Sequence, residues 1–405
     1  MTVLTGQAWL TASATRSVLA ALEAAGGPGC ARFVGGCVRN ALMGREIDDI
    51  DIATTLKPEE TERAIRAAGL KAVPTGIAHG TVTAVAERQP FEITTLRRDV
   101  STDGRNATVA FTDDWAEDAA RRDFRLNALY ADGEGRVFDP TGQGVADAAA
   151  GRIVFVGDPG TRIREDYLRI LRFFRFFAWY GRGEPDAAGL DACRDLAPGM
   201  TRLSAERVSK ELMKLLAATD PRPAMAAMEK TGVLAQVLPE AGPLTLFDAV
   251  VDLSDDPVVR LMTLFPVDAE AMRRASERLR FPNAARDRLV GSALAAPVVS
   301  LDMSDAQARA AVYRQGGRAV ADALMRLHAA APGRGEAAMR LLAVANGWVR
   351  PRLPVGGKEV ARLGLEPGPE TGRLLKAFED SWIAADFPSE GHAERLAALV
   401  SPRRG

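Results

Sequence analysis

The sequence contains little cysteine and little histidine, with 3 residues of each among 405. Cys30, Cys37 and Cys193 form no CxxC pair, which argues against a disulfide framework and predicts reduced thiols in a cytoplasmic protein. The histidines, among them His79, have no metal-ligand spacing. No HD pair and no serine or cysteine nucleophile elbow occurs, so we expect neither zinc chemistry nor a protein nucleophile.

The sequence also lacks long apolar runs and a net charge. No uncharged stretch of about 18 apolar residues occurs, so we expect no membrane-spanning helix and no membrane partner. Residues 1–25 lack a basic start followed by a long apolar run, so no signal peptide is expected. The formal net charge is −1, so attraction to nucleic acid would depend on local clusters of arginine. Nothing in the composition implies a protein partner.

The pattern of residues changes once along the chain. Trp9–Ala25 carries leucine and alanine at helical spacing and predicts a helix, and Pro58–Ala68 predicts another. Short β-rich runs between glycine, proline and aspartate clusters predict strands at Cys30–Val34, Ile50–Ala53, Gly80–Ala86, Phe91–Leu96 and Arg136–Phe138. Beyond Val156 the pattern is helical and punctuated by proline.

We therefore predict an α+β fold, with a small mixed-sheet head followed by an all-helical remainder. A chain of 405 residues is long enough for two to four domains. The expected divisions are the head at residues 1–151 and helical segments at residues 152–216, 217–290 and 291–405.

The densest signal is the aspartate pair Asp49 and Asp51. The two residues are two apart on a predicted strand, so both carboxylates lie on one face while Ile50 and Ile52 face a core. An isolated pair of this kind is usually solvated. Two like charges side by side are costly unless a cation is shared between them, and Mg²⁺ prefers oxygen ligands.

The residues just upstream favour the metal interpretation. Gly35 and Gly36 follow a predicted strand and precede a short helix that carries Arg39. Glycines at such a turn let backbone N–H groups approach a phosphate closely. No GK[ST] follows, so the run is not a P-loop, and a glycine pair by itself is more often a plain turn.

An arginine-rich run occupies residues 121–129. Arg122 could clamp a triphosphate with its forked donors, and Asp123 and Asn127 could bond a ribose hydroxyl. A charged helix face with local ion pairs explains the same residues.

A second run follows at residues 165–177. Its aromatic and aliphatic residues share one helical face, and Asp166, Arg169, Arg172 and Arg175 form a slanted polar stripe. Two interpretations stay open for this stripe, a solvated salt-bridged face and a wall that binds a nucleotide or phosphate.

Together these runs resemble the class II CCA-adding tRNA nucleotidyltransferase and bacterial poly(A) polymerase family, within the polymerase-β superfamily. Five motifs in register between Phe33 and Glu211 carry the resemblance. They are GGxVRD with DxD, RRDFxxNA at residues 121–128, a hinge motif at residues 138–147, EDxLRxxRxxRF from residue 165, and the run at residues 202–211. Asn40 stands where the family usually has aspartate, and Arg125 where threonine is commoner.

The resemblance implies a head, neck, body and tail for the four segments above, with RNA bound by the helical half. It implies Asp49 and Asp51 as catalytic residues and Mg²⁺ ligands. The nucleotide-binding residues that it implies are Gly35, Gly36, Arg39, Arg122, Asp123, Asn127, Asp166, Arg169, Arg172 and Arg175.

Base selection is expected from Asp166 and Arg169. Cytosine and adenine both present an exocyclic amine beside a ring-nitrogen acceptor, which a carboxylate and a guanidinium complement. Guanine and uracil present the opposite order and would leave buried polar groups unpaired, at roughly 1–3 kcal/mol each.

The expected chemistry is in-line attack of an RNA 3′-hydroxyl on the α-phosphorus of CTP or ATP, with two Mg²⁺ bound by Asp49, Asp51 and the triphosphate. Glu92, on a nearby predicted strand, is a candidate third carboxylate. We predict addition of CCA to tRNA 3′ ends. The alternatives are a poly(A) polymerase, a CC- or A-adding specialist and, outside the class, a non-catalytic RNA-binding protein. The polar stretch at residues 98–118, where CC-adding specialists lack a loop, favours full CCA addition.

Overall fold

The computed structural model describes residues 2–76, 80–103 and 106–400, and the side chains of residues 99–109 are left out of the description. His79 therefore lies outside the described residues. The chain forms two compact units, residues 1–239 and 240–405. The finer boundaries expected at residues 151, 216 and 290 stay predictions.

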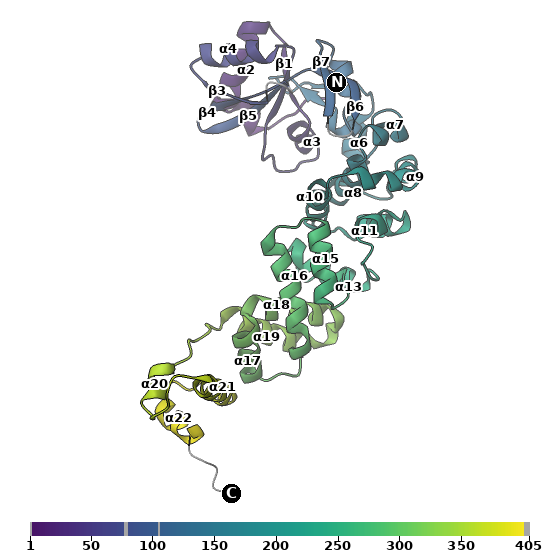
Figure 1. Ribbon diagram of the computed structural model, residues 1–405. Coiled ribbons are helices and arrows are strands. Elements are labelled where there is room, and N and C mark those ends of the chain that lie inside the picture. The colour runs from purple at the N-terminus through teal and green to yellow at the C-terminus, as the bar shows by residue number, and fades with distance from the viewer. Residues whose placement is uncertain (1, 77–79, 104–105, 401–405) are drawn as a thin grey trace. The chain divides into compact units, whose positions relative to one another are not determined.

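The first unit begins with a mixed seven-stranded sheet of order β3-β4-β5-β2-β1-β8-β9 (Figure 1). Its strands are β1 (Ala31–Val34), β2 (Asp51–Thr54), β3 (Lys71–Gly76), β4 (Thr81–Ala86), β5 (Gln89–Thr95), β8 (Tyr130–Ala131) and β9 (Val137–Phe138). The central strand β2 runs antiparallel to β1 and parallel to β5, and its register places Asp51 opposite Glu92. Asp51 therefore begins a strand that is hydrogen-bonded to a neighbouring strand on both sides.

The five strands expected from the sequence are confirmed within a residue or two. Three further segments were missed, namely β3, β8 and the hairpin of β6 (Arg97–Asp103) with β7 (Asn106–Phe111). Strand β3 lies at the sheet edge and contains Pro74, which weakens its signal. The expected helix at Trp9–Ala25 is two helices, α1 (Ala8–Thr11) and α2 (Ser13–Gly26), because Ala12 is extended at φ −61° and ψ 139°.

Apolar side chains bury the sheet against helices. Helices α2 and α4 (Pro58–Ala67) pack on each other, and both contact β4 (Figure 1). Phe33, Ile52 and Phe91 have no exposed surface, and Trp9 meets the Phe33 ring edge-on at 4.8 Å between centroids. The other helices of the head are α3 (Gly36–Leu42), α5 (Trp115–Ala120), the 3₁₀ turn η2 (Arg125–Asn127) and α6 (Gly144–Ala150).

The rest of the first unit is helical, and the described residues beyond Val156 form no strand, as expected. Its helices are α7 (Pro159–Glu165), α8 (Leu168–Tyr180), α9 (Ala187–Leu196), η3 (Ala197–Arg202), α10 (Ala205–Leu216), α11 (Arg222–Lys230) and α12 (Val233–Val237). Phe173 and Phe176 of α8 pack on Phe124 of the head, with ring centroids 6.3 and 5.1 Å apart, and Phe173 also stacks on Phe155 at 5.5 Å. This aromatic cluster fixes α8 against the head, so both can line one site.

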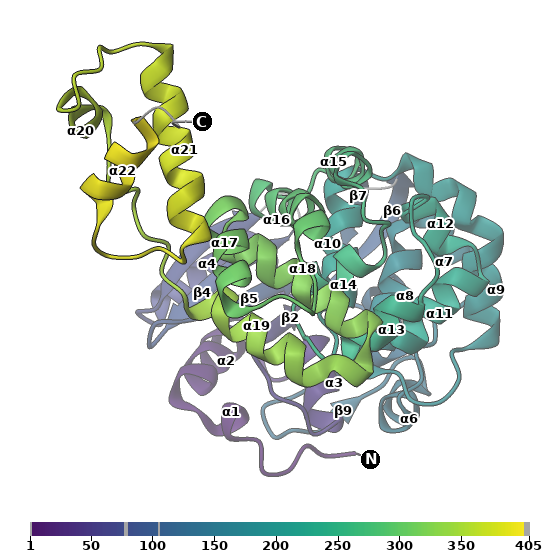
Figure 2. The same cartoon turned by 90° about the horizontal axis from the view of Figure 1, so that it is seen from below.

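The second unit is also helical (Figure 2). Its helices are α13 (Thr245–Val251), α14 (Pro257–Thr263), α15 (Ala269–Arg278), α16 (Asn283–Ala295), η4 (Ala296–Val298), α17 (Asp305–Gln315), α18 (Gly317–Ala330), η5 (Pro332–Arg334), α19 (Gly335–Gly347), α20 (Gly357–Ala361), α21 (Pro369–Ala384) and α22 (His392–Val400). Helix α18 packs against both α16 and α19 in one core, and Tyr313, Phe378 and Trp382 contribute to another. No described helix is long and apolar enough to cross a membrane.

Candidate active site

The aspartate pair lies where β2 begins. Asp51 is the first residue of the strand and is half-buried, while Asp49 precedes the strand and is exposed. Ile50 and Ile52 are 3% and 0% exposed, as the expected alternation requires. Burial, followed by the charges of Glu92 and Asp49, raises the pKa of Asp51 to about 6, and Arg122 opposes this rise. The Asp51 carboxylate is thus held close to like charges.

The carboxylate oxygens of Asp49 and Asp51 suit a divalent cation. A shared cation would offset the repulsion that raises the pKa of Asp51. Among the described residues, no three His, Cys, Asp or Glu side chains form a metal cage by themselves. Mg²⁺ usually binds through one or two carboxylates together with substrate phosphates, so Asp49 and Asp51 fit this ion. Glu92 stays a candidate third ligand.

The raised pKa of Asp51 gives a prediction for stability. The folded protein binds a proton at Asp51 up to about pH 6, whereas the unfolded chain releases it near 3.8, so folding stability falls as pH rises between these values. Asp51→Asn should therefore raise the free energy of unfolding of the metal-free protein at pH 8 by roughly 1–2 kcal/mol, a figure reduced because solvent screens the partly exposed carboxylate. At pH 4 the increase should be much smaller. Thermal unfolding in chelator at both pH values measures this. Asp48→Asn, an exposed neighbour, is the control, and a destabilised Asp51→Asn at pH 8 would contradict the prediction.

Gly35 forms the turn between β1 and α3. Its φ of +68° is a conformation that favours glycine, and a Cβ atom built there would lie 3.7 Å from Nη1 of Arg122. The backbone at Gly35 and Gly36 therefore lies beside the arginine that the sequence assigns to a triphosphate.

Arg39 is 7% exposed, and its guanidinium is engaged on several sides. It donates to Asn127 Oδ1 at 2.6 Å and to the Tyr180 hydroxyl at 2.8 Å, and so links α3 to η2 and to the end of α8. Asn40 accepts from Arg39 Nε and Nη2 at 3.1 and 2.9 Å and donates to the Glu46 carbonyl at 2.7 Å. The asparagine thus connects Arg39 to the loop that leads to Asp49.

An open cavity of about 540 Å³ lies between the head and α8. It is lined by Gly35, Gly36, Arg39, Asp51, Arg97, Arg121, Arg122, Asp123, Asn127, Asp166, Leu168, Arg169, Arg172, Phe176 and Arg207. Most of the site residues expected from the sequence are among them, while Asp49 and Arg175 are not. Arg97, Arg121, Leu168, Phe176 and Arg207 line the cavity but were not among the predicted site residues. Arg207 lies within the fifth motif at residues 202–211, so the sequence did contain a signal that could have identified it.

Asp123 links the head to α8 inside this cavity. Its Oδ2 accepts from Arg172 Nε and Nη2 at 2.8 and 2.5 Å, and its Oδ1 accepts from Asn127 Nδ2 at 3.0 Å. Burial would raise the pKa of Asp123, but the Arg172 charge and these hydrogen bonds lower it to about 2. Asp123 is therefore a carboxylate at any physiological pH.

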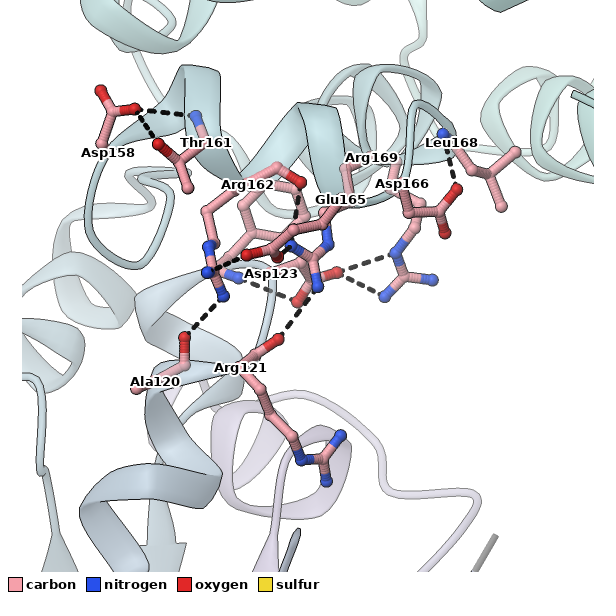
Figure 3. A network of polar contacts seen from close by, with 12 residues as sticks. Ala120, Arg121, Asp123, Asp158, Thr161, Arg162, Glu165, Asp166, Leu168 and Arg169 are labelled. Atoms are coloured by element: carbon pink, nitrogen blue, oxygen red, sulfur yellow. Dashed lines mark hydrogen bonds and ion pairs between the residues drawn. The ribbon is translucent and has the colours of Figure 1, made fainter. Parts of the chain in front are cut away.

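Asp166 and Arg169 both line the cavity, with Asp166 in the break between α7 and α8 and Arg169 in the first turn of α8 (Figure 3). Asp166 Oδ2 accepts from Arg207 Nη2 at 2.6 Å, and its Oδ1 accepts from the Leu168 amide at 3.1 Å. Arg169 Nη1 donates to Glu165 at 2.5 Å, and Nη2 donates to the Arg121 carbonyl at 3.0 Å. Both side chains are therefore oriented before any ligand binds.

Arg175, the third arginine of the stripe, does not line the cavity, unlike Arg169 and Arg172. Arg175 donates from Nε to Glu211 at 2.5 Å and stacks over Phe176 at 4.4 Å. This ion pair joins α8 to α10, so the salt-bridge interpretation fits Arg175 better than contact with a nucleotide.

Several proteins of known name are similar to this chain over most of its length. Residues 31–154 match the poly(A) polymerase head domain, and residues 185–244 match a probable RNA- and SrmB-binding site of polymerase A. The mitochondrial CCA tRNA nucleotidyltransferase 1 of Homo sapiens is 34% identical over 374 residues, covering 89% of this chain and 84% of that protein. The CCA-adding enzyme of Bacillus stearothermophilus in complex with CTP has a TM-score of 0.76 at 24% identity, covering 96% of this chain and 98% of that one. The Thermotoga maritima CCA-adding enzyme complexed with tRNA has a TM-score of 0.65 at 19% identity, covering 92% and 91%.

Proposed function

The chain belongs to the CCA tRNA nucleotidyltransferase family, and from this premise we propose that it adds CCA to tRNA 3′ ends from CTP and ATP without a nucleic-acid template. One observation carries the proposal. A single cavity is lined both by Asp51, where nucleotidyl transfer would occur, and by Asp166 and Arg169, which would select the base. The named activity of a relative that aligns over most of both chains supports it.

The residues of this chain have separate roles in the proposed reaction. Asp49 and Asp51 bind the divalent ion, which when bound supplies positive charge for the attacking hydroxyl and the departing pyrophosphate. Arg122, beside Gly35, donates to the triphosphate, and Asp123 and Asn127 orient the ribose. These residues would hold the α-phosphorus in position for in-line attack by the RNA 3′-hydroxyl, with pyrophosphate as the leaving group.

Selection of cytosine and adenine depends on fixed side chains. Arg207 orients the Asp166 carboxylate as an acceptor for the exocyclic amine, and Glu165 orients Arg169 as a donor to the ring nitrogen. Because these partners are already bonded, the wrong base would meet groups that do not rotate to suit it. The protein would therefore select the base with side chains that are already oriented before the nucleotide binds.

RNA contacts come from the helical part of the chain, which includes the match to an RNA-binding region at residues 185–244. Such binding would use the RNA backbone and shape more than its bases. The cytoplasmic location inferred from cysteine usage stays a prediction, since one relative is named as mitochondrial.

Incubation with tRNA that lacks its 3′ CCA tests the function. We expect no complete end with CTP or ATP alone, and three added nucleotides followed by a stop when both are present. A long ladder with ATP alone would identify a poly(A) polymerase instead. Use of ATP only on ends that already carry CC would identify an A-adding specialist, and a stop after two cytidines with both nucleotides would identify a CC-adding one. No extension under any condition would favour the non-catalytic RNA-binding protein.

A further inference from the structure

Asp118, in α5, is a carboxylate whose side chain is 1% exposed. Its Oδ1 accepts from Arg121 Nη2 and Nε at 2.7 and 2.9 Å. Its Oδ2 accepts from Arg122 Nη2 at 2.9 Å and from the Tyr130 hydroxyl at 2.7 Å. The same hydroxyl lies 3.3 Å from Arg122 Nε. One buried carboxylate thus orients two guanidinium groups that line the cavity.

The charges in this cluster do not balance. Arg121 and Arg122 share a single carboxylate, which leaves one positive charge at the cavity wall. Among the other cavity arginines, Arg172 pairs with Asp123 and Arg207 with Asp166, while Arg169 shares Glu165 with Arg162. The excess positive charge suits a polyphosphate.

Asp118 keeps its charge in this environment. Burial would raise its pKa, but Arg122 and Arg121 outweigh burial and lower the pKa to about 2. Burial also raises the pKa of Tyr130, so its hydroxyl stays a donor to Asp118. The acceptor of both guanidiniums is therefore present throughout the physiological pH range.

Arg122 lies on the carboxylate side of the cavity. A Cβ atom built on Gly35 would lie 3.7 Å from Nη1 of Arg122, and the positive charge of this arginine opposes the rise that burial causes in the pKa of Asp51. A group bound by Arg122 would accordingly lie beside the pair that is assigned to the metal. In a bound nucleotide that group is the triphosphate.

We propose that Asp118 is a positioning residue that fixes Arg121 and Arg122 for the triphosphate of the incoming nucleotide. The proposal rests on the function proposed above, since it requires a nucleoside triphosphate in the cavity. Tyr130 assists by donating to Asp118. Neither residue touches the substrate, and both act through the two arginines.

Binding of CTP and of CMP by the full chain tests this role, because the two ligands share base and ribose and differ in the terminal phosphates. In Asp118→Asn the dissociation constant for CTP should rise at least about tenfold, while that for CMP changes less than about threefold. Tyr130→Phe keeps the carboxylate and should raise the CTP constant about two- to fivefold. Asp132→Asn is the matched control, because Asp132 is 7% exposed, bonds Arg136 at 2.6 Å and does not line the cavity.

An equal loss of CTP and CMP binding in Asp118→Asn would mean general damage to the fold and would overturn the proposal. Unchanged CTP binding in both the Asp118 and the Tyr130 variants would overturn it too. Should Asp118→Asn not fold, the selective effect of Tyr130→Phe decides. Extension of tRNA by the unmodified protein is a separate result, so a failure of the proposed function is distinguishable from a failure of this inference.

Discussion

Replacement of Asp49 by alanine should reduce nucleotide incorporation at least about a thousandfold and leave the fold intact. Asp49 is exposed and precedes β2, so its side chain contributes little packing. We propose its carboxylate as one of two that bind the divalent ion, and loss of a charge-stabilising metal ligand typically removes several kcal/mol of transition-state stabilisation. Single-turnover incorporation of CMP into tRNA measures the rate, and circular dichroism with thermal unfolding checks the fold.

Asp48→Ala is the matched control for this variant. Asp48 is also an exposed aspartate, and it lies one residue earlier, outside the alternation that places Asp49 and Asp51 on one face. We expect less than about a threefold effect from it. A folded Asp49→Ala protein with ordinary activity would refute the assignment of the metal site.

The carboxylate pair could be predicted because its signal is local. Period-two alternation of Asp49 and Asp51 with Ile50 and Ile52 is visible in four residues, and burial follows it. The strand that supplies Glu92 is distant in sequence. Glu92 was suggested as a nearby carboxylate, but the parallel register that sets it opposite Asp51 appears only in the sheet.

Side-chain partners could not be predicted in the same way. Periodicity places Arg175 on the polar stripe of α8, but its choice of Glu211 depends on how α10 packs against α8. Likewise, the pair of Arg207 with Asp166 spans 41 residues of sequence. The pairs of Asp118 with Arg121 and Arg122 are local in sequence, but its burial and its bond from the Tyr130 hydroxyl depend on tertiary packing.

The same limit applied to secondary structure. The hairpin of β6 and β7 lies within a polar stretch that resembled a loop, since the sequence of β6, RRDVSTD, is almost wholly polar and the two strands form a sheet of their own in the described part of the chain. The helices of the neck were clearer, because α8 carries four phenylalanines at helical spacing. Strong apolar periodicity thus predicted the longer elements of the core, whereas polar or very short strands were missed, including the two-residue strand β8 inside the sheet.

Asp166→Ala should weaken discrimination between bases. Removal of the carboxylate eliminates the acceptor for the amine of cytosine and adenine, so kcat/KM for CTP and ATP should fall about 10- to 100-fold. Uracil and guanine lose an unfavourable contact at the same position, so the preference for CTP over UTP should contract by at least about tenfold. These factors correspond to the roughly 1–3 kcal/mol of one buried unpaired group. Single-nucleotide incorporation with each of the four triphosphates gives the ratios.

Asp158→Ala separates base selection from a general effect on the neck. Asp158 caps the start of α7 by accepting from the Thr161 amide at 2.7 Å, is exposed, and does not line the cavity (Figure 3). Its loss should cost about 1 kcal/mol of stability and leave the CTP-to-UTP ratio unchanged. If Asp166→Ala lowered incorporation of all four nucleotides by one common factor, Asp166 would only brace Arg207, and the base would have to be recognised by other residues of the cavity. A contraction of the ratio confined to Asp166→Ala would instead establish the carboxylate as the acceptor that distinguishes cytosine from uracil.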